Sequence, residues 1–242
     1  MTILTLLWML AQAPAQDEKA LEKAATEASD AFKKAFKGTE AEKIAAIDQV
    51  ATVQHKVTAN RLAGVLEANE STRVRTAAVR ALGRFTDQKK PAATVLSSAL
   101  PAHRAEPGLF SAICSAMEDL KDPSVAPALI RFFEDKDEAV ATRSMEAAGK
   151  LGSSSAIDPL IAVVTHSEKI IKNASRQAST VVTNPNTGEQ FVSPPEMRAR
   201  DHARVLMNSA NTALKNLTSE PITTGDAWSA WWSKNKSTFD RK

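Results

Sequence analysis

Apolar residues recur along this chain in helix-length segments that repeat about every 31 residues. Leu120 and Leu151 are 31 residues apart, and Leu129 and Leu160 show the same separation. Within each segment the apolar positions are spaced by three and four residues, which is the spacing of one face of an α-helix. Two such helices cannot bury both apolar faces alone, whereas stacked pairs bury them in one continuous core. The spacing therefore predicts an all-α protein, an α-solenoid of about five helical hairpins.

The composition supports a helical chain and excludes several other classes. Ala accounts for 42 of the 242 residues, while there are only 8 Gly and no Tyr. Because Ala favours helices and Gly weakens them, a β-sandwich or a β-barrel is excluded. The formal net charge of +3 is too small to indicate a dedicated binder of nucleic acid or membrane surfaces. The single cysteine, Cys114, excludes an intrachain disulfide and a cysteine-rich metal site.

The first residues are typical of a secretory signal peptide. Ile3–Leu10 form an apolar run that is too short to span a bilayer, and Ala13-Pro14-Ala15 fits a cleavage site that leaves Gln16 as the new N-terminus. No Lys or Arg precedes the run, and an apolar first helix or an uncleaved anchor are the alternatives. We expect a cleaved signal, an exported protein that is periplasmic or secreted, and no transmembrane span in the mature chain.

The pattern divides the chain into three parts. Residues 1–15 are the expected signal peptide, and residues 16–166 hold an N-terminal helix followed by the regular repeats. Residues 167–242 hold a final repeat, which contains an inserted loop and ends in a helix that carries tryptophans.

The insertion at residues 183–195 interrupts the helical pattern with three Pro and one Gly. Asn184–Gly188 is a turn signal, so the short segments on either side of it are expected to form a small β-hairpin. Loops that interrupt a solenoid project from it and often carry its specificity, which makes Phe191 a candidate contact residue. A surface excursion without a role is the alternative. Arg198 and Arg200 follow the insertion as a basic group.

Three of the four tryptophans lie near the C-terminus. Asp226 is placed to cap a helix on which Trp228, Trp231 and Trp232 share one face. We expect this helix to cover the apolar end of the last repeat, because the end of a solenoid requires such a cap. An aromatic surface for a peptide or a carbohydrate is the alternative.

The repeated segments resemble a known family. Val74–Gly83 resembles the first-helix signature of HEAT repeats, in the short variety also found in phycocyanobilin-lyase-like repeats. Val125–Ile130 and Ala156–Ile161 look like the matching second helix, while Gly149 departs from the pattern because it lies inside an expected helix. Ala213–Thr218, together with the tryptophan cluster, resembles the terminal segment of exported bacterial HEAT-repeat proteins. The resemblance implies a solenoid of HEAT-like hairpins whose concave face is lined by second helices, a fold that hosts many functions.

Basic residues gather in one of the expected first helices. Arg73, Arg80 and Arg84 are seven and four residues apart, so they form a stripe beside the apolar face. We expect a solvated face with ion pairs between repeats, and the family resemblance implies such a pair between Arg75 and an acidic residue of the next repeat. A site for an anionic ligand or for nucleic acid is the alternative.

Motifs for catalysis and cofactor binding are missing from the sequence. It has no phosphate-binding glycine loop, nucleophile elbow or His-Glu-x-x-His helix, and its four His lie in different segments. We expect no catalytic residue, metal site or cofactor, and a protein or peptide partner bound on the concave face or the insertion. A chromophore-lyase-like or other enzyme on a HEAT scaffold is the alternative, since the lyase-like repeat family includes proteins that attach tetrapyrroles. The candidate interaction residues are Arg73, Arg80, Arg84, Arg198, Arg200, Phe191, Trp228, Trp231 and Trp232.

Overall fold

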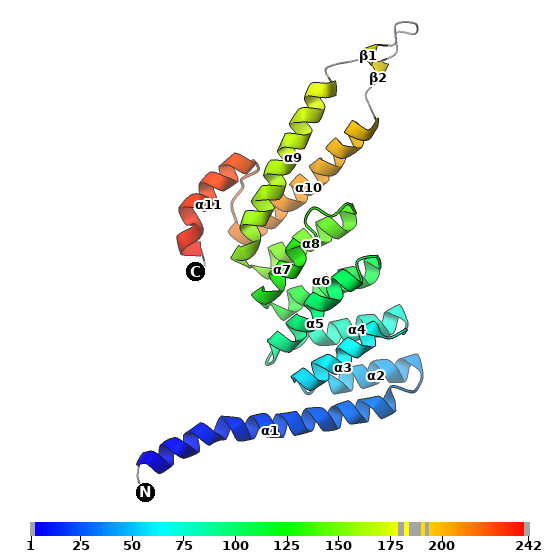
Figure 1. Cartoon of the computed structure of the whole chain (residues 1–242), viewed down its shortest axis with the longest axis vertical. Coiled ribbons are helices and arrows are strands. Elements are labelled where there is room, and N and C mark those ends of the chain that lie inside the picture. Colours follow the sequence, from blue (N-terminus) through cyan, green and yellow to red (C-terminus); the bar gives the residue numbers. More distant parts are fainter. Residues whose placement is uncertain (1–2, 179–181, 184–189, 192–193, 240–242) are drawn as a thin grey trace. The chain divides into compact units, whose positions relative to one another are not determined.

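The described residues form helices and the turns between them, apart from one short pair of strands (Figure 1). The computed structural model describes residues 3–178, 182–183, 190–191 and 194–239, with side chains described for 18–175 and 197–239. The chain forms two compact units, Met1–Asp122 and Pro123–Lys242. The helices follow one another in chain order and pack against their neighbours within each unit, and the expected α-solenoid fold is confirmed.

In the N-terminal unit, the first helices of successive repeats stack on one another in one row, and the second helices stack in another row. The elements are α1 (Ile3–Ala35), α2 (Glu40–Val50), α3 (Lys56–Glu67), α4 (Thr72–Gly83), α5 (Lys89–Ala102) and α6 (Pro107–Leu120). Helices α2, α4 and α6 pack side by side as one row, and α3 packs against α5 in the other. Between the rows lie fully buried leucines such as Leu62, Leu82 and Leu96, which are the residues that the helical spacing places on the inner faces.

Helix α1 starts earlier than the sequence pattern predicts. It begins at Ile3 rather than near Asp17, so the expected signal segment is helical and continuous with the first helix. The Leu- and Ala-rich composition of this stretch favours helix strongly enough to extend it through Pro14. The side chains of residues 1–17 lie outside the described part of the chain. Among the described helices, none combines the length and the apolar character needed to cross a membrane.

The C-terminal unit continues the pattern with one insertion. Its elements are the 3-10 turns η1 (Pro123–Val125) and η2 (Ser154–Ala156), the helices α7 (Ala126–Ile130), α8 (Glu138–Leu151), α9 (Ile157–Ala178), α10 (Pro194–Thr218) and α11 (Gly225–Phe239), and the strands β1 (Val182–Thr183) and β2 (Gln190–Phe191). Helix α8 packs against α10, and α9 packs against both α10 and α11. Residue 166, where the sequence pattern ends the regular repeats, lies within α9.

The insertion lies between two long helices that run side by side (Figure 1). Helix α9 has 22 residues and α10 has 25, about twice the length of the shorter repeat helices such as α2. Val182 pairs with Phe191 and Thr183 with Gln190 in antiparallel register, which confirms the expected small hairpin. We call α9, β1, β2 and α10 together the arm. Asn184–Gly188 lies outside the described residues.

The glycine that departs from the repeat pattern allows two helices to approach closely. A Cβ at Gly149 would lie 2.8 Å from the Ala213 Cα of α10, too close for any side chain. Gly83 serves the same purpose in the N-terminal unit, since a Cβ there would lie 2.9 Å from the Ala116 Cα of α6. Both glycines therefore lie where one first helix packs against the next.

Candidate interaction surface

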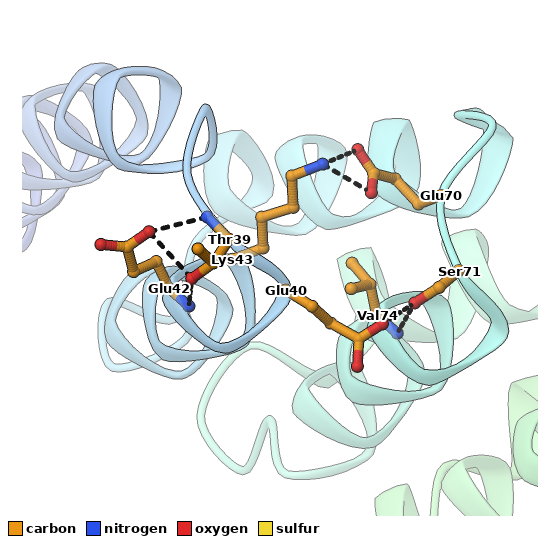
Figure 2. Close-up of polar contacts among 7 residues, drawn as sticks. All are labelled: Thr39, Glu40, Glu42, Lys43, Glu70, Ser71 and Val74. Carbon is orange, nitrogen blue, oxygen red and sulfur yellow. Dashed lines mark hydrogen bonds and ion pairs between the residues drawn. The ribbon is translucent and has the colours of Figure 1, made fainter.

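Polar contacts between neighbouring hairpins hold α2 against the start of α4 (Figure 2). The Lys43 Nζ donates to both carboxylate oxygens of Glu70, at 2.7 and 2.8 Å. The Ser71 hydroxyl, which caps α4, donates to the Glu40 carboxylate at 2.6 Å. Thr39 and Glu42 form a reciprocal capping box that starts α2. These contacts fix the register of one hairpin on the next.

Arg75 makes the corresponding contact one repeat later. Its Nη1 and Nη2 donate to the two carboxylate oxygens of Glu106 at 3.0 and 2.6 Å, in a bidentate pair across 31 residues. The pairing implied by the family resemblance is therefore present. The Arg75 guanidinium, and next the His103 ring 2.9 Å away, lower the pKa of Glu106 from its ordinary 4.5 to about 2.

Because of the Arg75–Glu106 pair, we expect the free energy of unfolding to depend on pH in the acid range. Because folding lowers the pKa of Glu106, the pair stabilises fully above about pH 4.5 and loses this effect as the pH falls towards 2. The Glu106 side chain is 39% exposed, so solvent screening limits the effect to about 1 kcal/mol. We expect Glu106→Gln to lower the free energy of unfolding by about that much at pH 7 and by almost nothing near pH 2.

Urea titrations at several pH values measure this dependence. The matched control is Glu67→Gln on α3, an exposed glutamate without an ion pair to any described residue, which we expect to leave stability unchanged. If Glu106→Gln lowers the free energy of unfolding equally at pH 7 and at pH 3, the lowered pKa of Glu106 in the folded protein is contradicted.

The arginine stripe of α4 is partly neutralised by acids of α2. The Arg84 Nη2 lies 2.6 Å from the Asp48 Oδ1, and the Arg73 Nη1 lies 3.4 Å from the Glu40 Oε1. Arg80 has no ion pair with a described residue. These pairs are the ion pairs between repeats that the sequence predicts, and they reduce the positive charge open to an anionic ligand.

Arg80 and Arg84 also line a groove along the first-helix row, which we call the first-helix groove. It has a volume of about 510 Å³. Its floor consists mainly of small side chains, and Asp48 and Asp119 bring acidic groups into it. The residues that line it are Ile44, Asp48, Ala77, Arg80, Arg84, Ala112, Ser115, Ala116 and Asp119. Two arginines and two aspartates balance in charge, so this groove has no net preference for an anion.

The second-helix row carries a smaller hollow. Helices α3 and α5 enclose about 270 Å³ between residues that include Leu66, Glu67, Val95 and His103. Partner binding on this row stays a prediction from the sequence.

The other candidate residues lie in the C-terminal unit. Arg198 is exposed at the start of α10, and the Arg200 Nε lies 3.5 Å from the Asp201 Oδ1. Phe191 belongs to β2, and its side chain lies outside the described part. Because Arg73, Arg80 and Arg84 belong to the N-terminal unit, the two basic groups belong to different compact units.

The tryptophans of α11 form a packed cluster rather than an open aromatic face. Trp228 is fully buried and Trp232 is 5% exposed, while Trp231 is half-buried. Trp231 stacks on Trp232 with ring centres 6.3 Å apart, and the ring of Phe239 packs edge-on against both. This arrangement matches the capping helix that the sequence predicts, because α11 covers α9.

Asn211 connects the cap to the last repeat. Its Oδ1 accepts from the Trp228 Nε1 at 2.8 Å, and its Nδ2 donates to the Thr223 carbonyl at 3.0 Å. At the start of α11, the Gly225 amide donates to the Glu168 Oε1 at 3.2 Å. A Cβ on Gly225 would overlap the Thr165 side chain, so a glycine is required for this close approach.

These links create an open groove that the sequence does not reveal, which we call the C-terminal groove. It lies between α9, α10 and residues 219–224 and has a volume of about 800 Å³. Its lining residues are Glu168, Ile171, Lys172, Met207, Asn208, Asn211, Thr212, Lys215, Pro221, Ile222, Thr223 and Thr224. No periodic signal could have found it, because the irregular segment 219–224 brings Ile222 to residues more than forty positions earlier.

The histidines and the cysteine have structural surroundings. The Nδ1 of His55 accepts from the Val57 amide at 3.2 Å and so caps α3, and His202 lies 3.1 Å from Glu138. Cys114 is buried in α6. Within the described part of the chain, no three His, Cys, Asp or Glu side chains are grouped so that they could hold a metal ion.

Two family models match the chain. The model for HEAT repeats matches residues 102–179, and the model for the PBS lyase HEAT-like repeat matches residues 74–100. No curated protein matches the chain. The stacked helices define the fold class of this protein, an α-solenoid, and residues 74–100 and 102–179 are similar to HEAT repeats.

Proposed function

We propose that this protein is a non-catalytic scaffold for protein–protein interaction, exported to the cell envelope, which binds a protein or peptide segment. The observation that carries the proposal is the C-terminal groove, an open and mainly apolar hollow at the base of the arm. Stacked repeats provide extended surfaces of this kind, and solenoid proteins use such surfaces to bind partners. A groove of several hundred cubic ångströms that combines apolar surface with polar groups at its edges suits a bound segment.

The exposed apolar residues also favour the arm as the region that binds. Among the described residues, the large hydrophobic side chains that are exposed are Met197, at 42%, and Val205, at 36%. Both lie on α10, the helix that also lines the C-terminal groove. The insertion that interrupts the repeat pattern lies between α9 and the same helix.

Export is the second part of the proposal and rests on the sequence of the first sixteen residues. Cleavage after Ala15 would remove the apolar run and leave a mature chain that starts at Gln16. Mass spectrometry of the protein isolated from its native cells tests this point, and an intact N-terminus in a cytosolic fraction would refute export.

A capture experiment tests the scaffold. Tagged mature protein is incubated with the envelope fraction of its native cells, and untagged protein is added as a competitor. We expect a reproducible set of proteins that the competitor displaces. Deletion of residues 184–193 removes most of the insertion, which is a candidate contact region for the partner. We therefore expect this variant to capture at least about tenfold less protein, while its circular dichroism spectrum stays helical. If the wild-type protein retains nothing that the competitor displaces, the scaffold function is refuted.

A further inference from the structure

Some polar groups that line the C-terminal groove are hydrogen-bonded within the protein, and others are not. The Glu168 carboxylate accepts from the Gly225 amide, and both ends of the Asn211 side chain are occupied by Trp228 and Thr223. The charged groups that remain are the exposed ammonium groups of Lys172 and Lys215, which make no hydrogen bond or ion pair with any described residue. The other lining side chains without such a bond are neutral, namely the amide of Asn208 and the hydroxyls of Thr223 and Thr224. The free charged groups of the groove are therefore both cationic, and together with Glu168 the lining has a net charge of +1.

The apolar part of the groove lies beside these lysines. Ile171 precedes Lys172 on α9, and Met207 lies eight residues before Lys215 on α10. Eight residues of helix span about 12 Å, which is the length of about four residues of extended peptide. Ile222 and Pro221 close the groove from the third side.

We propose that the C-terminal groove binds a short acidic segment of a partner protein, with apolar side chains against Ile171, Met207 and Ile222 and with carboxylates towards Lys172 and Lys215. This inference rests on the proposed scaffold function and specifies the chemistry of its partner. Charge complementarity favours this occupant, because carboxylates are attracted by the two ammonium groups, whereas a basic segment is repelled by them. The first-helix groove lacks this selectivity, since Arg84 is paired with Asp48 and the two arginines are balanced by two aspartates.

Fluorescence anisotropy with a defined peptide tests the chemistry directly. The probe is fluorescein-labelled Leu-Glu-Leu-Leu-Glu-Leu, and two matched peptides carry Gln or Lys in place of Glu. We expect the Glu peptide to bind the mature protein about three- to tenfold more tightly than the Gln peptide, and the Lys peptide to bind most weakly. Absence of measurable binding by the Glu peptide, or equal affinity for all three, overturns the proposal.

Charge reversal in the protein locates the binding site. We expect Lys215→Glu to weaken the Glu peptide about three- to fivefold, and the double variant Lys172→Glu, Lys215→Glu to prefer the Lys peptide. Lys169→Glu is the matched control, because Lys169 is exposed on α9, the helix of Lys172, and does not line the groove. A Lys169→Glu effect as large as that of Lys215→Glu would refute the groove as the site.

The contribution of apolar contacts to peptide affinity is measured with a separate variant. Ile222→Ser should weaken the Glu and Gln peptides by the same factor, about three- to tenfold, since it removes contact area and no charge. An unchanged affinity would show that the segment does not enter the groove.

Repeating the capture experiment with the double lysine variant separates this inference from the scaffold function. If the variant retains the same partners as the wild-type protein, the groove assignment is wrong while the scaffold function stands. If the wild-type protein retains no partner, the scaffold function itself fails. A loss of partners in the double variant, with capture preserved in Lys169→Glu, supports both.

Discussion

Leu120→Asp is expected to unfold the N-terminal unit at moderate urea concentrations. Leu120 is 1% exposed and ends α6, so the substitution removes a buried apolar side chain and replaces it with a charge that has no partner in the core. Loss of a buried leucine costs about 2–5 kcal/mol, and an unpaired buried charge adds several more. We therefore expect a loss of at least about 4 kcal/mol, close to the whole stability of many domains.

Leu151→Asp is the matched comparison for this prediction. The 31-residue register makes Leu151 the equivalent of Leu120, and from the sequence alone the two substitutions should cost the same. In the structure Leu151 is only half-buried at the end of α8, so we expect Leu151→Asp to cost about 1–2 kcal/mol. Urea unfolding followed by circular dichroism measures both variants. Equal losses would contradict the difference in burial.

Trp228→Ala should release the C-terminal cap. Trp228 is fully buried, and its indole donates to Asn211, which in turn fixes the segment before α11 through Thr223. Removing such a side chain costs about 3–5 kcal/mol through lost contacts and a cavity. We expect α11 to detach, faster cleavage by protease within residues 219–224, and exposure of the apolar surface on α9 that α11 covers.

Two further variants separate the causes of this effect. Trp228→Phe keeps an aromatic ring but removes the donor to Asn211, and we expect it to cost about 1–2 kcal/mol. Trp231→Ala removes a half-buried ring and should cost less than half as much as Trp228→Ala. Thermal unfolding and limited proteolysis measure these differences. A Trp228→Ala variant with wild-type resistance to protease would refute the role of this residue as the anchor of the cap.

The candidate residues show which features of the surface can be predicted from local sequence spacing and which cannot. The spacing of Arg73, Arg80 and Arg84 correctly predicts a shared stripe and ion pairs between repeats, because positions on one helix are set by helix geometry. The same spacing does not indicate which acids face the stripe, since Glu40 and Asp48 come from the preceding hairpin. Similarly, Trp228, Trp231 and Trp232 are predictable as one face, but their different burial depends on what α11 packs against.

The sequence by itself determined the helices, their pairing into hairpins and the short β-pair. Each of these depends on spacings within about 31 residues and on turn-forming residues between them. Tertiary structure alone decided the close contact at Gly149 and the C-terminal groove. Those features join residues such as Gly149 and Ala213, or Ile171 and Ile222, that lie fifty or more positions apart. Their contact depends on how whole helices pack, which no local pattern of residues encodes.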